Sequence, residues 1–322
     1  MKLSSMPEMH PSLPVVVIGG PTASGKSSLA LDLAERFGGT VVNADSMQVY
    51  RELRVLTARP GAADLARAPH RLYGVLSAAE RCSAARWRSL ALDAIREARE
   101  LGRLPVVVGG TGLYLRGLME GLVELPPIPD AVRTAAREAR EALGAAGFHA
   151  DLATRDPAAA ARLDPADRTR TLRAWEVVVA TGRPLTDWQA RGPGAPPADL
   201  RFLPVLVLPP REVLYARCDR RFAGMLDEGA LAEVRMLDLL GLDPELPAMK
   251  ALGVPELRAH LRGELGLAAA VEAAKRQTRR YAKRQVTWFR HQWERMHSWH
   301  VADAQQTENA IAEIGTILRE TR

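Results

Sequence analysis

A glycine-bounded loop near the N-terminus carries the residue types that bind phosphate groups. The stretch GGPTASGKSS fits the pattern G-x-x-x-x-G-K-[S/T], which here is made by Gly20, Gly25, Lys26 and Ser27. Glycines let backbone N–H groups converge on an anion, a lysine neutralises negative charge, and a serine hydroxyl can bind Mg²⁺. Because an apolar run precedes the loop and a helical pattern follows it, a phosphate site is favoured over an ordinary glycine-rich turn.

Such a loop is typical of enzymes that bind ATP, and these enzymes also place an acidic residue at the end of a strand to hold Mg²⁺. The apolar runs PVVVGGTG and FLPVLVLPP end without an acid, whereas VVNADSMQVY ends in Asp45. Open α/β sheets bind ligands at the carboxyl ends of their strands. Asp45 is therefore a candidate base or metal ligand, and a helix N-cap is the structural alternative.

Thr111 is a third candidate, at the end of the apolar run in VGGTGLY. A hydroxyl beside two glycines can approach a phosphate or its metal ion, although a residue of this type is also common in turns. If the strands are parallel, the loop at Gly20–Ser27, Asp45 and Thr111 meet at one edge of the sheet. That convergence makes a shared site the better interpretation of all three.

The stretch KRQTRRYAKRQVTWFRHQWER, at 275–295, carries eight lysines and arginines against one glutamate. On a helix, the residues Arg276, Arg280, Lys283 and Arg284 line one side, with Arg279 beside them. Such a row of charge suits the phosphate backbone of a nucleic acid. The alternative is a solvated helix face that aromatic residues anchor to the core, and we assign Trp288 and Trp293 to the core on either interpretation.

Bulk properties exclude several classes of protein. The chain has 322 residues, 47% of them hydrophobic, with a net charge of +6 and a pI near 9.7. Two cysteines, Cys82 and Cys218, are too few for a disulfide framework and have no metal-ligand spacing, so both are expected to be free thiols. We find no signal peptide and no apolar run long enough to span a membrane, and we predict a cytoplasmic protein.

Apolar runs that alternate with helical patterns place these residues in an α/β fold. Between Val15 and about Leu115 the pattern predicts a parallel sheet with helices on both faces, like the core of P-loop NTPases. Proline- and glycine-rich breaks then delimit an alanine- and arginine-rich helical insertion. We predict a core at 12–124, an insertion at 125–199, a return to the core with basic helices at 200–303, and a tail at 304–322.

Several motifs together resemble the bacterial tRNA dimethylallyltransferases. They are GPTASGKS, ADSMQVYR, TARP, APHRL, LPVVVGGTGLYL, RTLRAWEV and RQTRRYAKRQVTWFR, in the family's order, and the match runs from about Val15 to Trp299. That family transfers a dimethylallyl group from dimethylallyl diphosphate to N6 of the adenine 3′ of the anticodon. The resemblance implies that the loop grips a leaving diphosphate rather than ATP, which would explain the missing strand-terminal acid.

The resemblance also implies roles for individual residues. The diphosphate would be held by Gly20, Thr22, Ala23, Ser24, Gly25, Lys26, Ser27 and Arg221, with Mg²⁺ near Ser27. Asp45, Thr111 and Lys26 would be catalytic, with Asp45 accepting a proton from the exocyclic amine. The tRNA would be contacted by Asp45, Ser46, Met47, Gln48, Thr111, Arg133, Arg168, Thr169, Arg170, Thr171, Leu172, Arg173, Met249, Lys250, Ala251, Leu252, Gly253, Val254, Arg276, Gln277, Arg279, Arg280, Lys283 and Arg284.

Three positions depart from the family pattern. Arg59 replaces the usual lysine of TAKP, Trp175 replaces a leucine, and Val254 replaces a tyrosine after Gly253. None lies in the proposed chemistry, but the last departure alters any tRNA contact that the tyrosine makes.

Two other functions remain open at this point. One is a P-loop kinase or an isopentenyltransferase that acts on free adenine nucleotides, which has less need of a basic helix. The other is a nucleotide-dependent RNA-binding protein without transfer chemistry. In each case we expect a monomer.

Overall fold

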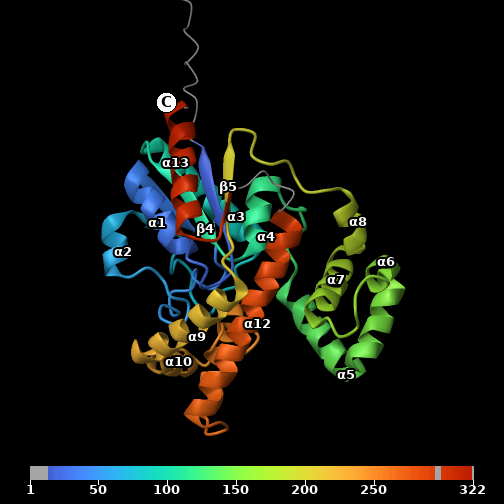
Figure 1. The fold of residues 1–322 in the computed structure, drawn as a ribbon. Coiled ribbons are helices and arrows are strands. Elements are labelled where there is room, and N and C mark those ends of the chain that lie inside the picture. The colour runs from blue at the N-terminus through green and yellow to red at the C-terminus, as the bar shows by residue number, and fades with distance from the viewer. Residues whose placement is uncertain (1–13, 294–298, 321–322) are drawn as a thin grey trace, which may run out of the picture. The chain divides into compact units, whose positions relative to one another are not determined.

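The computed structural model describes residues 14–293 and 299–320, and the chain forms two compact units, residues 1–119 with 197–322 and residues 120–196. Unit 1 contains a six-stranded sheet in the order β3-β2-β4-β1-β5-β6, in which every neighbouring pair is parallel (Figure 1). Its strands are β1 Val15–Gly19, β2 Gly39–Asn43, β3 His70–Arg71, β4 Leu104–Gly109, β5 Phe202–Val207 and β6 Trp299–Val301. The predicted parallel α/β sheet is confirmed.

Helices cover both faces of this sheet. The helices of unit 1 are α1 Lys26–Phe37, α2 Ala62–Arg67, α3 Ala84–Glu100, α4 Gly112–Glu120, α9 Arg211–Asp227, α10 Ala230–Leu239, the 3₁₀ helix η1 Pro247–Lys250, α11 Val254–Leu261, α12 Leu267–Trp293 and α13 Ala304–Glu320. Among the helices of the described residues, none is long and apolar enough to cross a bilayer.

The apolar strands are continuous because each face of the sheet packs against its own hydrophobic core. In β1, Val15 and Val17 point into a core formed with α3, α4, α11 and α12. Val16 and Ile18 point to the opposite core, which α1 and α13 complete. Alternate residues of a strand face opposite sides of the sheet, so a strand that is buried on both sides is apolar at every position.

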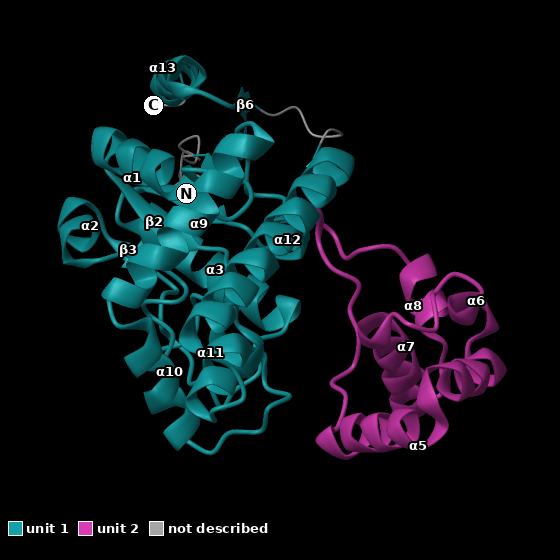
Figure 2. Cartoon of the chain, turned by 60° about the horizontal axis from the view of Figure 1, so that its bottom comes forward, with its two compact units in different colours: residues 1–119, 197–322 teal, residues 120–196 magenta. Residues whose placement is uncertain are grey.

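Unit 2, shown in magenta in Figure 2, is entirely helical. Its helices are α5 Asp130–Arg155, α6 Pro157–Ala160, α7 Arg168–Thr181 and α8 Leu185–Ala190. Phe148, Leu152 and Trp175 form the centre of its small core. Trp175 fits there in place of a leucine because its indole N–H donates to the Asp151 carboxylate at 2.6 Å, which satisfies its polar atom.

Two parts of unit 1 differ from the pattern expected of the sequence. The short edge strands β3 and β6 have two and three residues, too few for an alternation pattern to reveal them. Residues Ala304–Glu320, expected to form a tail, are the helix α13, whose Ile311 and Ile314 are buried against the sheet. Both cysteines are free thiols, as predicted.

Candidate functional site

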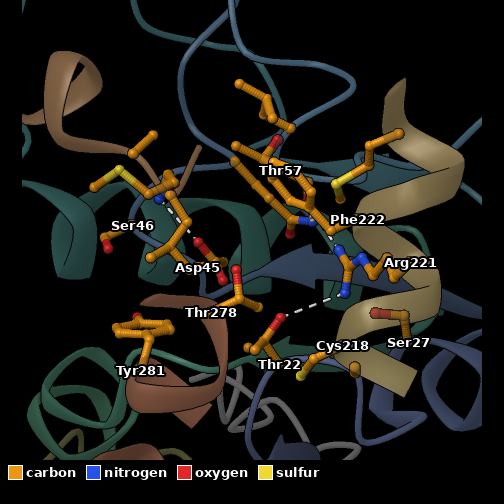
Figure 3. A pocket seen from close by; sticks show the side chains of 18 of the residues that line it. Thr22, Ser27, Asp45, Ser46, Thr57, Cys218, Arg221, Phe222, Thr278 and Tyr281 are labelled. Carbon is orange, nitrogen blue, oxygen red and sulfur yellow. Dashed lines mark hydrogen bonds between the residues drawn. The ribbon is translucent and has the colours of Figure 1, made fainter. Parts of the chain in front are cut away.

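A cavity of about 320 Å³ in unit 1 is lined by residues that the sequence separates widely. It is bounded by the phosphate loop after β1, the segment after β2, the end of β4, and helices α9 and α12 (Figure 3). The predicted residues that line it are Thr22, Ala23, Lys26, Ser27, Asp45, Ser46, Met47, Gln48, Arg221, Lys250, Ala251, Leu252 and Arg284. The carboxyl edge of the sheet therefore brings the predicted chemistry together.

The phosphate loop has the backbone shape of an anion cradle. Ala23 and Gly25 both have positive φ, at 61° and 99°, on either side of Ser24. Left-handed residues interleaved with right-handed ones turn successive N–H groups toward one point. Helix α1 follows at once, and no side chain caps its first turn, so its free amides are available to an anion bound in the cradle.

Two cations lie beside this cradle, Lys26 buried and Arg221 half-buried. Lys26 is only 9% exposed, and its ammonium group donates to the Pro21 carbonyl at 3.1 Å. Burial lowers the pKa of Lys26 to about 8, Asp45 opposes that shift, and Arg221 adds to it. The Arg221 guanidinium lies 3.4 Å from the Thr22 hydroxyl and donates to the Thr57 carbonyl at 3.2 Å, and burial lowers its pKa too. A bound anion would stabilise both charged forms.

Asp45 is held in a fixed loop at the end of β2. One of its carboxylate oxygens accepts a hydrogen bond from the Met47 N–H at 2.9 Å, while its own N–H donates to the Asn43 side chain at 2.8 Å. Asn43 is buried and also donates to the Leu72 carbonyl. The residues after Asp45 form turns, so the N-cap interpretation is wrong.

Thr111 positions this loop rather than lining the cavity. Its hydroxyl oxygen accepts from the Ser46 N–H at 3.0 Å and lies 3.2 Å from the Ser46 hydroxyl. This bridge joins the end of β4 to the residue next to Asp45. Gly20, Ser24 and Gly25 likewise shape the phosphate loop without reaching the cavity surface.

The outer face of α12 is strongly basic. Arg276, Arg280, Lys283 and Arg284 are exposed, and within the described residues none of them has a carboxylate within 4 Å. Arg279 differs, since it forms an ion pair with Asp219 of α9 at 2.6 Å. We call the four exposed side chains the α12 basic face; Gln277, half-buried, lies on the same helix.

The aromatic side chains of α12 anchor it from the opposite side. Trp293 is buried and packs edge-on to Phe289, with ring centroids 5.4 Å apart, and Trp288 packs against the same core. Their assignment to the core is confirmed, while Glu294 and Arg295 lie outside the described residues.

The MKALGV segment contributes less surface than expected. Met249, Gly253 and Val254 are buried in the core of unit 1, and Val254 is 0% exposed. Met249 and Val254 therefore present little side-chain surface to a ligand in this structure, and the tRNA contact expected of the segment stays a prediction. Lys250 is exposed and forms an ion pair with Glu245 at 2.8 Å.

The predicted tRNA-contacting residues of unit 2 also include both exposed and buried side chains. Arg168, Thr169 and Arg170 are exposed at the start of α7. Thr171 is buried and accepts a hydrogen bond from Arg140 at 3.1 Å, so its role is structural. Leu172 is half-buried. Arg133 and Arg173 flank the Glu176 carboxylate at 3.8 and 3.6 Å, and burial lowers the pKa of Arg173.

Several residues of the cavity wall escaped sequence reasoning. Thr278 and Tyr281 of α12 line the cavity, as do Tyr73 and Phe222. A signal for the first two exists: residues 278, 281 and 285 follow the i, i+3, i+7 spacing of one helix face. That face points toward the cavity, and Arg284, at the margin of the α12 basic face, reaches the same cavity beside Tyr281.

Sequence reasoning also missed Glu233 of α10, which organises the loop that carries Thr57. Its carboxylate accepts hydrogen bonds from the N–H groups of residues 54, 55 and 56, at 2.7, 2.7 and 3.0 Å. Arg59 closes the same loop by donating to the carbonyls of Tyr50 and Arg51, at 3.4 and 3.1 Å. The arginine that replaces the family's lysine thus serves loop structure.

The fold and the site define a P-loop-like α/β protein with a cavity that carries cationic side chains at the carboxyl edge of its sheet. The IPP transferase family matches residues 48–292, and the isopentenyl transferase family matches residues 13–78. The chain belongs to the IPP transferase family.

Curated relatives and solved structures agree with this assignment. The tRNA dimethylallyltransferases of Rhodospirillum centenum and Paramagnetospirillum magneticum are 64% and 51% identical to this chain, over 88% and 96% of it and 90% and 97% of their own lengths. The tRNA isopentenylpyrophosphate transferase of Bacillus halodurans is 32% identical, with a TM-score of 0.67 and coverage of 96% and 97%. A eukaryotic dimethylallyltransferase acting on tRNA is 26% identical, with a TM-score of 0.77, over 96% of this chain and 80% of its own.

Proposed function

We propose that this protein transfers a dimethylallyl group from dimethylallyl diphosphate to N6 of adenosine 37 in tRNA, 3′ of the anticodon, and releases diphosphate. The observation that carries the proposal is one cavity that holds a buried cation, Lys26, and a half-buried one, Arg221, together with the carboxylate of Asp45. The cations would stabilise the negative charge of a leaving diphosphate, and the carboxylate would accept the proton that the amine must lose. The relatives named above support the same substrate class.

The donor's leaving group gains negative charge as its allylic C–O bond breaks. Lys26, Arg221 and the free amides at the start of α1 lie where they would stabilise that charge, and burial strengthens each interaction by excluding water. N6 of adenine is a weak nucleophile because its lone pair is delocalised into the ring. Stabilising the departing diphosphate is therefore the larger part of the catalytic task.

Asp45 would complete the reaction at the nitrogen. As the N6–carbon bond forms, the amine acquires positive charge and loses a proton to the carboxylate. The hydrogen bonds from Met47 and to Asn43 hold Asp45 in place, and Thr111 fixes the adjoining residue. We therefore interpret Thr111 as a residue that positions the base.

A magnesium ion fits this site. The Ser27 hydroxyl is exposed in the first turn of α1 and lines the cavity. Within the described part of the chain, no group of three His, Cys, Asp or Glu side chains could hold a metal by itself. That donor set matches Mg²⁺, which keeps several waters and takes its other ligands from substrate phosphates. When bound, Mg²⁺ would neutralise charge on the diphosphate.

The tRNA would bind to exposed arginines and lysines. The α12 basic face suits an RNA phosphate backbone, and the arginines at the start of α7 offer a second contact. Such contacts would offset the few kcal/mol needed to unstack the target base. We further propose that the protein is a monomer and that, with tRNA as its substrate, it acts in the cytoplasm.

A transfer assay tests this function directly. The protein is incubated with labelled dimethylallyl diphosphate and an unmodified anticodon stem-loop, and the RNA is then examined for label and for added mass on the loop adenine. We expect label on RNA and none on free AMP. Label on AMP alone would support a transferase that acts on free nucleotides, and phosphoryl transfer from ATP would support a kinase. RNA binding without label would support a nucleotide-dependent RNA-binding protein without transfer chemistry.

The variant Asp45→Ala separates binding from chemistry. It removes the proton acceptor but leaves the α12 basic face intact, so stem-loop affinity should stay within about twofold while transfer falls by about 10²–10⁴-fold. Asp45→Asn should behave similarly. Unchanged turnover would exclude Asp45 from the mechanism.

A further inference from the structure

Gln285 of α12 lies at the junction of the phosphate loop and the central strand β4. Its side-chain oxygen accepts a hydrogen bond from the Thr22 N–H at 2.9 Å, and its side-chain nitrogen donates to the Gly110 carbonyl at 2.8 Å. The residue is only 6% exposed. A single buried amide therefore links the phosphate loop to the segment that carries Thr111.

The surroundings of Gln285 are built for this contact. A Cβ at Gly110 would overlap the Gln285 amide, so the close approach requires glycine there. One turn further along α12, Phe289 is packed so tightly on Gly19 that a Cβ there would lie 2.7 Å from its ring. Both contacts press α12 against the carboxyl edge of the sheet. Gln285 consequently has little freedom to leave its two partners.

The first contact changes how the anion cradle works. Because the Thr22 N–H already donates to Gln285, it is not available to a diphosphate. Of the amides that follow, the Ser24 N–H donates to the Pro21 carbonyl at 3.3 Å, which leaves the cradle with those of Ala23, Gly25, Lys26 and Ser27. Their orientation depends on where Thr22 is held, because the left-handed residues Ala23 and Gly25 follow it directly in the loop.

We propose that Gln285 is a positioning residue that holds the phosphate loop in its diphosphate-binding shape. It would act from the helix that bears the α12 basic face, so one rigid element would support both substrates. The inference rests on the proposed function, because diphosphate is the ligand that the loop is expected to hold.

Gln285→Met tests the role of the two hydrogen bonds at nearly constant volume. Without these two hydrogen bonds, α12 no longer holds the Thr22 N–H in place, and diphosphate must order the loop when it binds. We expect that ordering to lower diphosphate affinity about tenfold. We expect the Kd of inorganic diphosphate, measured by calorimetry without RNA, to rise about tenfold, and the KM of dimethylallyl diphosphate to rise in parallel. The kcat at saturating donor and the Kd of the stem-loop should stay within about twofold.

Gln292→Met is the matched control. Gln292 lies two turns further along the same helix and accepts a hydrogen bond from Arg116 of α4 at 2.9 Å, without touching the phosphate loop. It should cost similar thermal stability but leave diphosphate affinity unchanged. Equal losses of diphosphate affinity in both variants would overturn the proposal, because they would reflect general loosening of α12.

Gln285→Glu provides a test that does not depend on how well the methionine variant folds. A protonated carboxyl can accept from the Thr22 N–H and donate to the Gly110 carbonyl, as the amide does, whereas the carboxylate repels that carbonyl. The ratio of variant to wild-type diphosphate affinity should therefore recover as pH falls from 8.5 to 6. A ratio that stays flat would overturn the proposal.

The outcomes distinguish this inference from the proposed function. A wild-type protein that binds no diphosphate and transfers no prenyl group contradicts the proposed function. A wild-type protein that does both, with a folded Gln285→Met variant of equal diphosphate affinity, contradicts the role of Gln285 alone.

Discussion

The phosphate loop and the α12 basic face both present positive charge to an anionic ligand, but in opposite ways. Around the loop, Lys26 is buried and Arg221 half-buried, and both are held by hydrogen bonds to the protein. On α12, four cations are exposed and have no carboxylate partner within the described residues.

This difference determines what each region can do. A buried charge interacts strongly with its ligand and resists screening by salt, but burial also makes its protonation sensitive to pH. Exposed charges each add a small amount to the affinity for a polyanion, and salt weakens that attraction. The loop is therefore suited to stabilising a reacting group, and the helix face to holding a long polyanion.

The largest effect should come from Lys26→Met. The substitution removes a buried charge from the leaving-group site, so we expect the single-turnover transfer rate to fall by about 10²–10³-fold. Stem-loop affinity, measured by filter binding, should remain within about twofold. If affinity and transfer fell together, the division between the two regions would be wrong.

A rise in pH should weaken the loop and spare the helix. In the free protein the pKa of Lys26 is about 8, below the ordinary value of 10.5, and the protonated form binds diphosphate. The affinity of this site for diphosphate should therefore fall about twofold between pH 7 and pH 8 and about tenfold by pH 9. Stem-loop binding, which rests on arginines and an exposed lysine, should change little over the same range.

The double variant Arg280→Ala/Lys283→Ala tests the helix side. It removes two unpaired cations, so we expect stem-loop affinity to fall about fivefold and the slope of log K against log salt to decrease by about two. Diphosphate affinity should be unaffected.

Lys275→Ala is the control for that experiment. Lys275 lies on the same helix but is paired with Glu272 at 3.0 Å, so its removal should leave the salt slope nearly unchanged. Equal slopes for both variants would show that pairing does not distinguish these cations.

Glu233→Gln should have the smallest effect. An amide offers one acceptor oxygen where the carboxylate serves three N–H groups, so the loop at 54–56 should lose about 1 kcal/mol of stability, seen as a lower Tm. The loop supplies the Thr57 carbonyl to Arg221, so diphosphate affinity should fall slightly and stem-loop affinity not at all. A larger loss in RNA binding would contradict this placement.

Much of the fold and part of the site were predictable because their signals are local. The apolar run of β1, the glycines after it and the helix that follows specify a phosphate loop within 24 contiguous residues, from Pro14 to Phe37. Asp45 was predictable for the same reason, since it follows a strand whose carboxyl end must share an edge with β1. The alternating burial of β1 explains why its residues are uniformly apolar.

Other outcomes depend on partners distant in sequence. Within one basic stretch, Arg279 is paired because Asp219 lies on the neighbouring helix, whereas Arg280 is exposed. The sequence predicted that Met249 and Val254 belong to a ligand-binding segment. In the structure they are core residues, packed in one cluster with α9 and with Leu56. No periodicity in the sequence distinguishes these cases.

The sequence by itself therefore determined the parallel sheet, the phosphate loop, the acid at the end of β2 and a basic helix, because each follows from residue types over one or two adjacent elements. Only the tertiary structure decided which side chains face the cavity, which cations stay unpaired, and that Gln285 joins Thr22 to Gly110 across 263 and 175 residues of chain. The physical reason is that hydrogen bonds and burial depend on distances between elements, which packing sets and local pattern does not encode.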